Sequence, residues 1–163
     1  MATLEELERR IEAQEDLRAI ERLQATYWDT LDAKDWEGLR ACLVKDFVFV
    51  NNTTGGRYEG REGMLSTMRA KFAEGVTSSH QGHHHWIELT GEGTAVSHWS
   101  LEDDLYDARR GGEFVGRAHY DNAYVKIDGR WYFTEMSLTY LRGEADIKKC
   151  SEDCASAYQV FMM

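Results

Sequence analysis

The chain places four of its six histidines between residues 80 and 85, directly before an apolar stretch that is typical of a strand. Histidine is the side chain whose unperturbed pKa, roughly 6.5, lets it take up and release protons near neutral pH. A histidine-rich segment at the start of a buried strand could be a proton-transfer site, a metal site or a solvated loop. We expect His80 to precede the strand, and His83 and His85 to share one of its faces.

An acidic side chain lies among apolar ones in a second predicted strand. In the segment 95–106 the two-residue period puts Asp103 on the same face as Trp99 and Leu105. A buried carboxylate is costly unless it is paired or hydrogen-bonded. Asp103 is therefore either part of a salt bridge or an exposed strand end, or an acid that lines a cavity.

Two polar residues near the end of the first predicted helix could join them. Tyr27 lies on the apolar stripe of this helix, where a tyrosine is more often a core residue than a catalyst. Asp32 follows near the C-terminus of the helix, where the helix dipole disfavours a carboxylate. Orienting an imidazole would explain why an aspartate stands there.

Other site chemistries have less support. The spacing of His80 and His83 is compatible with zinc but unspecific, because zinc needs three or four convergent ligands. An odd number of cysteines argues against a disulfide framework, and Cys150 and Cys154 lack a second pair with which to hold a metal. The sequence contains no phosphate-binding glycine loop and no serine-hydrolase elbow. We expect neither a metal nor an organic cofactor.

Three helices and then a series of strands must position these residues. Apolar residues at three- and four-residue steps predict a helix over residues 3–33, and shorter helices follow over 35–43 and 61–75. β-Branched and aromatic residues predict strands over 46–51, 57–60, 83–89, 95–106, 114–127 and 130–140. This order is an α+β plan, in which a curved sheet covered on one face would enclose a pocket against the helices.

Length and charge bound the class of protein. The 163 residues suit a single domain, with residues 1–15 as an N-terminal helical arm and 143–163 as a tail with an apolar end. A net charge of −10 disfavours nucleic acid and anionic membrane surfaces as partners. No apolar run approaches the ~20 residues of a membrane span, and the acidic N-terminus does not resemble a signal peptide, so we expect a cytoplasmic protein.

The chain carries several short motifs, namely Ile20-x-x-Leu23-x-x-x-Tyr27-x-x-x-x-Asp32-x-x-Asp35-Trp36-x-x-Leu39, Tyr58-x-Gly60-Arg61-Glu62, His80-x-Gly82-His83, Trp99-x-Leu101-Glu102-Asp103 and the segment 126–133. Together they resemble the SnoaL-like family in the nuclear transport factor 2-like superfamily. The resemblance covers residues 16–140 and extends to the branch that includes bile acid 7α-dehydratase, scytalone dehydratase and a hexachlorocyclohexane dehydrochlorinase.

The resemblance implies a cone-shaped α+β barrel, built from a strongly curved mixed or antiparallel sheet, whose pocket catalyses eliminations without a cofactor. At the matching positions it implies that His80 is the general base and that Asp32 orients it. It implies that Tyr27 polarises the substrate carbonyl or leaving group and that Asp103 lines the pocket. It also implies a homodimer or homotrimer.

The rest of the expected pocket rests on fewer signals. We expect His83 to contribute, together with four large side chains that could form a wall for an aromatic or polycyclic substrate, namely Trp28, Met68, Phe72 and Trp99. Where bile acid 7α-dehydratase has an arginine in the last strand, this chain has Tyr140, and Arg142 would lie on the same face of an extended strand. His119 stands at a position where bile acid 7α-dehydratase has a phenylalanine, and it could act as a second acid.

The sequence therefore predicts a cofactor-independent lyase, most simply a dehydratase, that acts on a small aromatic or alicyclic hydroxy compound. The same proton chemistry would serve a formaldehyde-releasing lyase, an isomerase or a cyclase on aromatic substrates. A non-catalytic small-molecule-binding domain is the alternative outside enzymology, since fold does not dictate function. A metalloenzyme using the histidine segment is the third hypothesis.

Overall fold

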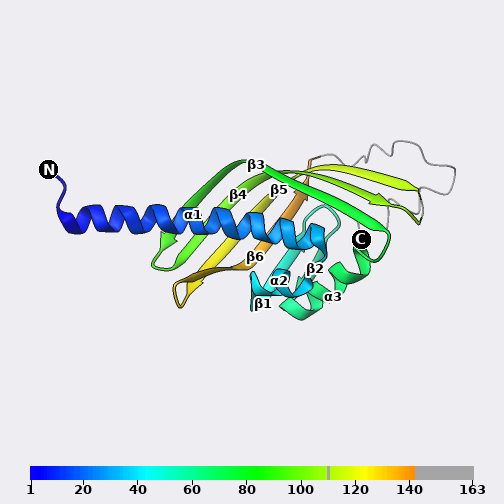
Figure 1. The fold of residues 1–163 in the computed structure, drawn as a ribbon, viewed down its shortest axis with the longest axis horizontal. Helices are drawn as coiled ribbons and strands as arrows, with labels where there is room; N and C mark the ends of the chain where they lie inside the picture. The colour runs from blue at the N-terminus through cyan, green and yellow to red at the C-terminus, as the bar shows by residue number, and fades with distance from the viewer. Residues whose placement is uncertain (110, 142–163) are drawn as a thin grey trace.

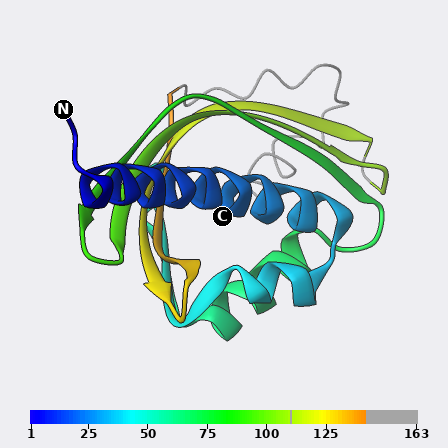
Figure 2. The same cartoon turned by 60° about the vertical axis from the view of Figure 1, so that its left-hand side comes forward.

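A curved sheet of six strands carries three helices on one side, and the first helix lies across the hollow of the sheet (Figures 1 and 2). The structure is a computed structural model that describes residues 1–109 and 111–141. Its elements, in chain order, are α1 (Leu4–Ala33), α2 (Trp36–Ala41), β1 (Leu43–Asn51), β2 (Gly56–Glu59), α3 (Arg61–Lys71), β3 (Val76–Gly91), β4 (Thr94–Asp107), β5 (Gly112–Ile127) and β6 (Arg130–Tyr140).

The strands lie in the order β2-β1-β6-β5-β4-β3. β1 and β6 run parallel, and all other neighbouring strands run antiparallel. The predicted α+β fold, with three helices and a strongly curved mixed sheet, is confirmed. The sheet does not close into a full barrel, because β2 and β3 form its two edges and do not pair with each other.

The core lies between the concave face of the sheet and the second half of α1. Buried side chains recur on α1 at three- and four-residue steps, at Ile20, Leu23, Gln24, Tyr27, Trp28 and Leu31. On β4 buried and less buried residues alternate, so that Leu101, Asp103 and Leu105 share the buried face. The face predicted for Asp103 is therefore correct.

The N-terminal end of α1 extends beyond the sheet (Figure 1). Its start is capped by Thr3, whose hydroxyl accepts the N–H of Glu6 at 3.2 Å. Three apolar side chains remain exposed there, Leu4 by 73%, Leu7 by 43% and Ile11 by 59%. No helix in the described part of the chain is both long enough and apolar enough to cross a membrane.

β3 is the element whose prediction was least accurate. It begins at Val76 rather than at residue 83, so His80 lies inside the strand instead of before it. A bulge then interrupts the pairing with β4 between His83 and Trp86, where His84 adopts a left-handed φ of 49°. Even-numbered residues face the core before the bulge and odd-numbered residues face it afterwards, so His83 and His85 do not share a face.

The other predicted bounds differ by a few residues. α2 ends at Ala41 rather than at residue 43, because Leu43 already pairs with Phe133 in the parallel ladder. β1 accordingly begins at Leu43 rather than at residue 46. α3 ends at Lys71 rather than at residue 75, and Gly75 has a left-handed φ of 90° that a helix cannot accommodate.

Candidate active site

Asp32 and His80 lie in contact where the end of α1 meets the start of β3. His80 Nδ1 is 2.6 Å from Asp32 Oδ1, and the backbone N–H of His80 donates to Asp32 Oδ2 at 2.9 Å. Only 4% of the His80 side chain is exposed. Because an ionised carboxylate only accepts hydrogen bonds, Nδ1 carries the hydrogen, and Nε2 keeps its lone pair. This is the arrangement of an oriented general base.

Ser78 and Lys34 extend this pair into a chain of four side chains. Ser78 Oγ donates to Asp32 Oδ1 at 2.7 Å, and Lys34 Nζ donates to Ser78 Oγ at 2.8 Å. Because an ammonium group can only donate, the hydroxyl hydrogen of Ser78 is directed to the carboxylate. Ser78 and His80 can both reach Asp32 because they are two residues apart on one strand.

Burial and hydrogen bonding act in opposite directions on the charges of this chain. Burial alone would raise the pKa of Asp32. Hydrogen bonds from His80 and Ser78, and the positive charge that His80 carries when its imidazole is protonated, lower this pKa overall. Burial lowers the pKa of Lys34, and the neighbouring Asp32 carboxylate opposes that change. Asp32 is therefore ionised at neutral pH and able to hold the Nδ1 hydrogen of His80.

His80 is part of the wall of a cavity between the helices and the sheet. The cavity is narrow, with about 50 Å³ open to the centre of a water-sized sphere, and part of it is open to solvent. Half of the described residues that line it are apolar, Met68 and Phe72 among them. The polar side chains that line it besides His80 are Tyr27, Asn51, Lys71, Asp103, Tyr120 and Tyr140. Such a cavity, apolar with a few polar groups, is typical of a small-molecule site.

Asp103 and Tyr140 form a second polar pair in the cavity. The Tyr140 hydroxyl donates to Asp103 Oδ2 at 2.6 Å, whereas Oδ1 is buried without a hydrogen bond of good geometry. Burial raises the pKa of Asp103, and the hydrogen bond from Tyr140 only partly opposes it. Gly116 makes room for the pair, because a Cβ there would overlap Asp103 Oδ1. A carboxyl group in this setting is disposed to carry a proton.

Two tyrosine hydroxyls in the cavity are available to a ligand. Tyr27 and Tyr120 are 1% and 3% exposed, and neither hydroxyl forms a hydrogen bond with another described residue. Burial raises the pKa of both phenols, with a further contribution to Tyr120 from neighbouring acidic groups such as Tyr27 and Asp103. Both are neutral hydrogen-bond donors at physiological pH.

Four of the residues assigned to the pocket do not line it. Trp28 and Trp99 are buried but pack edge to face on each other, with ring centroids 5.4 Å apart, behind the wall. A Cβ at Gly82 would overlap the Trp28 ring, which explains the glycine two residues after His80. His83 is exposed beside the bulge, and His119 lies on the outer face of β5. In this structure the four side chains therefore lie outside the cavity that His80 lines.

Two other histidines, His98 and His119, lie on the outer face of the sheet. His98 lies 4.6 Å from His119 and 6.1 Å from Trp86, measured between ring centroids. His98 Nδ1 is 2.7 Å from Asp121 Oδ1. Among residues 1–109 and 111–141, no three His, Cys, Asp or Glu side chains are grouped so that they could hold a metal ion. Arg142, Cys150, Cys154 and the predicted tail lie outside the described residues.

The sequence reasoning missed five polar residues of the site, Asn51 of β1 among them. Ser78 and Tyr120 were not identified, because the sequence does not show how their strands pair and therefore which of their side chains reach the cavity. Lys34 follows the first helix directly, and its left-handed φ of 59° turns it back toward Ser78. Lys71 is the last residue of α3 and reads as an ordinary helix-end lysine. A search for polar residues two positions from His80 would have found Ser78 alone.

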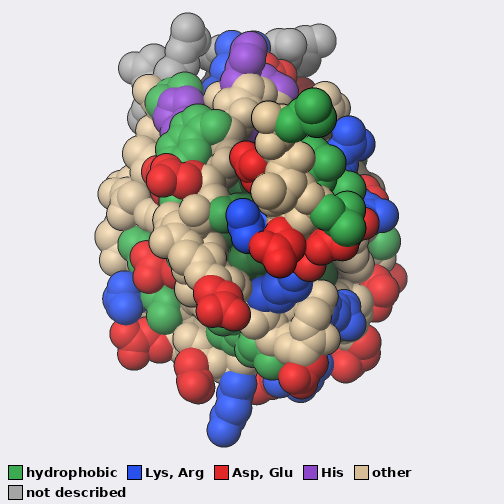
Figure 3. Space-filling view, turned by 90° about the vertical axis from the view of Figure 1, so that its left-hand side faces the viewer, with side chains coloured by type: hydrophobic (Ala, Val, Ile, Leu, Met, Phe, Trp, Pro, Cys, Tyr) green, Lys and Arg blue, Asp and Glu red, His purple; other side chains and the backbone are tan. Residues whose placement is uncertain are grey.

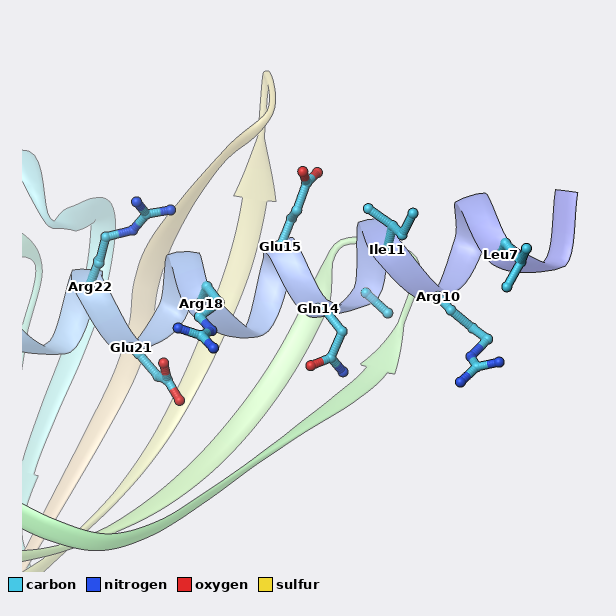
Figure 4. Close-up of a pocket in the computed structure, with 9 residues that line it drawn as sticks. Leu7, Arg10, Ile11, Gln14, Glu15, Arg18, Glu21 and Arg22 are labelled. Carbon is cyan, nitrogen blue, oxygen red and sulfur yellow. The ribbon is translucent and has the colours of Figure 1, made fainter. Parts of the chain in front are cut away.

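A second hollow lies along the N-terminal half of α1 (Figure 4). The described residues that line it all come from this one helix, Leu7, Ile11 and Arg18 among them. Acidic and basic side chains are interspersed on the face of the molecule toward which this part of α1 points (Figure 3). The cavity at His80, by contrast, is lined by residues from both helices and strands.

Comparison with known proteins places this geometry among related folds. The sequence model of the SnoaL-like domain family matches residues 12–137. A scytalone dehydratase-like protein from Novosphingobium aromaticivorans is 20% identical and superposes with a TM-score of 0.76, over 87% of this chain and 93% of the other. A hexachlorocyclohexane dehydrochlorinase is 16% identical with a TM-score of 0.76, over 88% and 99% of the two chains.

The same fold also occurs in proteins without a known activity. A protein of unknown function from Mycobacterium tuberculosis is 22% identical to this chain and has a TM-score of 0.74, over 93% of this chain and 88% of the other. At these identities the structures establish the fold alone. What this chain does must therefore be argued from its own cavity.

Proposed function

The chain belongs to the SnoaL-like domain family, and from this we propose that it is a cofactor-independent lyase of the dehydratase type. The observation that carries the proposal is the His80–Asp32 contact of 2.6 Å in the wall of a cavity that also holds a second carboxyl group, Asp103. Neighbouring folds include a scytalone dehydratase-like protein and a dehydrochlorinase, whose named reactions are eliminations. The proposed substrate is a small aromatic or alicyclic hydroxy compound.

His80 acts as the base in the proposed reaction. Nε2 takes a proton from a carbon next to the substrate carbonyl, and the electrons of the C–H bond form the new double bond. Asp32 keeps the ring in one orientation and stabilises the imidazolium that forms. A positioned base of this kind contributes about 10²–10⁴-fold to the rate.

Asp103 is the proposed acid. Its raised pKa favours the protonated form, which can give a proton to the departing hydroxyl group so that it leaves as water. The hydrogen bond from Tyr140 stabilises the carboxylate that this transfer leaves behind. Solvent then carries the proton from His80 back to Asp103. The hydroxyls of Tyr27 and Tyr120 can donate to the carbonyl oxygen as negative charge develops on it.

The same groups also suit reactions other than dehydration. A formaldehyde-releasing lyase, an isomerase or a cyclase acting on an aromatic substrate would each use one base and one acid in an apolar cavity. A small-molecule-binding domain without catalysis is the alternative outside enzymology, because the fold serves both roles. The buried carboxyl and imidazole favour catalysis, since a cavity for binding alone has no need of a polar pair that is costly to bury.

The proposal is tested by incubating the protein with a panel of single- and fused-ring hydroxy ketones and measuring products by mass spectrometry. Loss of 18 mass units, about the mass of one water, by the wild type and at least ~10²-fold less by His80→Gln is the expected result. Loss of 30 units, about one formaldehyde, would favour the second lyase reaction. Turnover that is equal in the wild type and in a folded His80→Gln variant would reject His80 as the base.

We further propose that the chain self-associates as a homodimer or homotrimer. The exposed Leu4, Leu7 and Ile11 form an apolar stripe on the projecting half of α1, and burial of such a stripe would stabilise an assembly. Sedimentation equilibrium at micromolar concentration should give a mass two or three times that of one chain. A monomer under these conditions would contradict the proposal.

A further inference from the structure

Lys71 brings a positive charge to the cavity from the end of α3. It is half-buried and lines the same cavity as His80 and Asp103. Its ammonium lies 5.7 Å from the centroid of the Tyr58 ring, which is a cation–π distance. The next residue, Phe72, has its ring 5.9 Å from that of His80, so the end of α3 contributes both side chains to the cavity wall.

This ammonium has no counter-ion among the residues that the structure describes. Burial lowers the pKa of Lys71, and no neighbouring carboxylate opposes that change. Lys126, by contrast, pairs with Asp16 at 2.6 Å, and Lys34 is held by Ser78 and by the charge of Asp32. Within residues 1–109 and 111–141, Lys71 is thus a partly buried cation without a neighbouring carboxylate, in a chain whose net charge is −10.

The other charged groups of the cavity are already accounted for. The Asp32 carboxylate is satisfied by His80 and Ser78, and the raised pKa of Asp103 disfavours its charge. A basic side chain in the last turn of a helix interacts favourably with the negative end of the helix dipole. In α3 the more exposed Arg69 provides this interaction as well as Lys71. The dipole explains a basic residue at this position and does not explain why its charge is partly removed from water.

We propose that Lys71 binds an anionic substituent, a carboxylate on an aromatic ring, and so makes this cavity selective for aryl carboxylic acids. The inference rests on the proposed function, in that the cavity is taken to be the substrate site. A carboxylate that reaches Lys71 would replace the missing counter-ion and form a charge-assisted hydrogen bond in a partly water-excluded site. The apolar wall with Met68 and Phe72 would receive the ring.

Benzoate and benzamide test this proposal, because they differ in charge and hardly in shape. Each is titrated into the full-length chain labelled at the methionine methyl carbons, and binding is read from the Met68 resonance. We expect benzoate to bind about 10- to 100-fold more tightly than benzamide. Lys71→Met should remove this preference while benzamide binding persists, and Lys71→Arg should retain it. Lys45→Met, at an exposed lysine of β1, removes the same charge elsewhere and should change nothing.

Three results would overturn the proposal. They are equal affinity of the wild type for the acid and the amide, a preference for the acid that survives in Lys71→Met, and no response of Met68 to either compound. His80→Gln separates this proposal from that of catalysis, since it should keep the preference for benzoate. A preference without lyase activity would sustain the anion site and reject the reaction. Lyase activity without a preference for benzoate would sustain the proposed reaction and reject the anion site.

Discussion

Asp32 holds His80 at two points, with one carboxylate oxygen 2.6 Å from the ring Nδ1 and the other accepting the backbone N–H at 2.9 Å. Two contacts from one carboxylate fix both the ring and the strand that carries it. The same carboxylate accepts a third hydrogen bond, from Ser78. The base is therefore oriented by the end of α1, and changes to Asp32 should affect both chemistry and stability.

Asp32→Asn should lower turnover by about 10²–10⁴-fold, because a neutral amide no longer selects the tautomer with hydrogen on Nδ1. It should also remove a pH-dependent part of the stability. The pKa of Asp32 is lowered in the folded chain, so its contribution is present above the unfolded value of 3.8 and is lost as the pH falls through the folded pKa. Urea unfolding should show the wild type more stable at pH 7, with the difference shrinking in acid. A difference independent of pH would contradict this.

Ser78→Ala should raise the pKa of Asp32, because the serine hydroxyl is one of the groups that lower it. The carboxyl carbon resonance of Asp32 should then titrate with a midpoint at higher pH than in the wild type. Lys34→Met should shift the midpoint in the same direction, since it removes a nearby positive charge. Ser66→Ala, at an exposed position of α3, is the matched control and should leave the midpoint unchanged. An unchanged midpoint in both Ser78→Ala and Lys34→Met would contradict the hydrogen-bonded chain formed by Lys34, Ser78, Asp32 and His80.

The sequence was enough to predict the buried faces of the helices and strands in which apolar residues recur at a regular spacing. The apolar stripe of α1 placed Tyr27 in the core, and the alternation on β4 placed Asp103 on the buried face. Both signals are local, because helix and strand periods fix which side chains share a face. The family resemblance added the pairing of Asp32 with His80, which lie 48 residues apart and which no local period connects.

The errors arose where a local irregularity changed the period. The bulge at His84 exchanges the two faces of β3, and it therefore reversed the expected direction of His83. The assignment of His119 came from the family resemblance, whereas the unbroken alternation on β5 places it on the face opposite Tyr120. Trp28 and Trp99 are apolar as expected, but which buried ring touches a cavity depends on packing that no sequence pattern encodes.

Gly116→Ala should separate Asp103 from Tyr140. A Cβ at this position would overlap Asp103 Oδ1 and would lie 2.6 Å from a carbon of the Tyr140 ring. We expect a loss of about 1–3 kcal/mol in the free energy of unfolding and a strong loss of turnover. Gly63→Ala is the control, because that glycine lies in α3 with nothing within 4 Å of the added carbon. There we expect a gain of about 0.5–1 kcal/mol and unchanged turnover. Equal effects at both glycines would contradict the packing argument.

Asp103→Asn should have the opposite pH signature to Asp32→Asn. The pKa of Asp103 is raised above its ordinary value of 3.8, so its contribution to stability is complete below 3.8 and is lost as the pH rises through the folded pKa. The asparagine variant cannot ionise and should gain stability relative to the wild type as the pH rises over this range. Urea unfolding between pH 4 and pH 8 measures the difference. Asp104→Asn, on the exposed face of the same strand, should show no such trend. A flat difference for Asp103→Asn would mean that the carboxyl is not protonated when buried.

Hydrogen–deuterium exchange next to a carbonyl tests the central claim most directly, because it reports proton abstraction without requiring a leaving group. The probe is 2-tetralone in D₂O at pD 7.5, with label incorporation followed by proton NMR. We predict that the wild type accelerates exchange and that His80→Gln loses at least ~10²-fold of this rate, whereas His98→Gln on the outer face keeps it. Exchange no faster with the wild type than with a folded His80→Gln variant would contradict the role of His80 as the base.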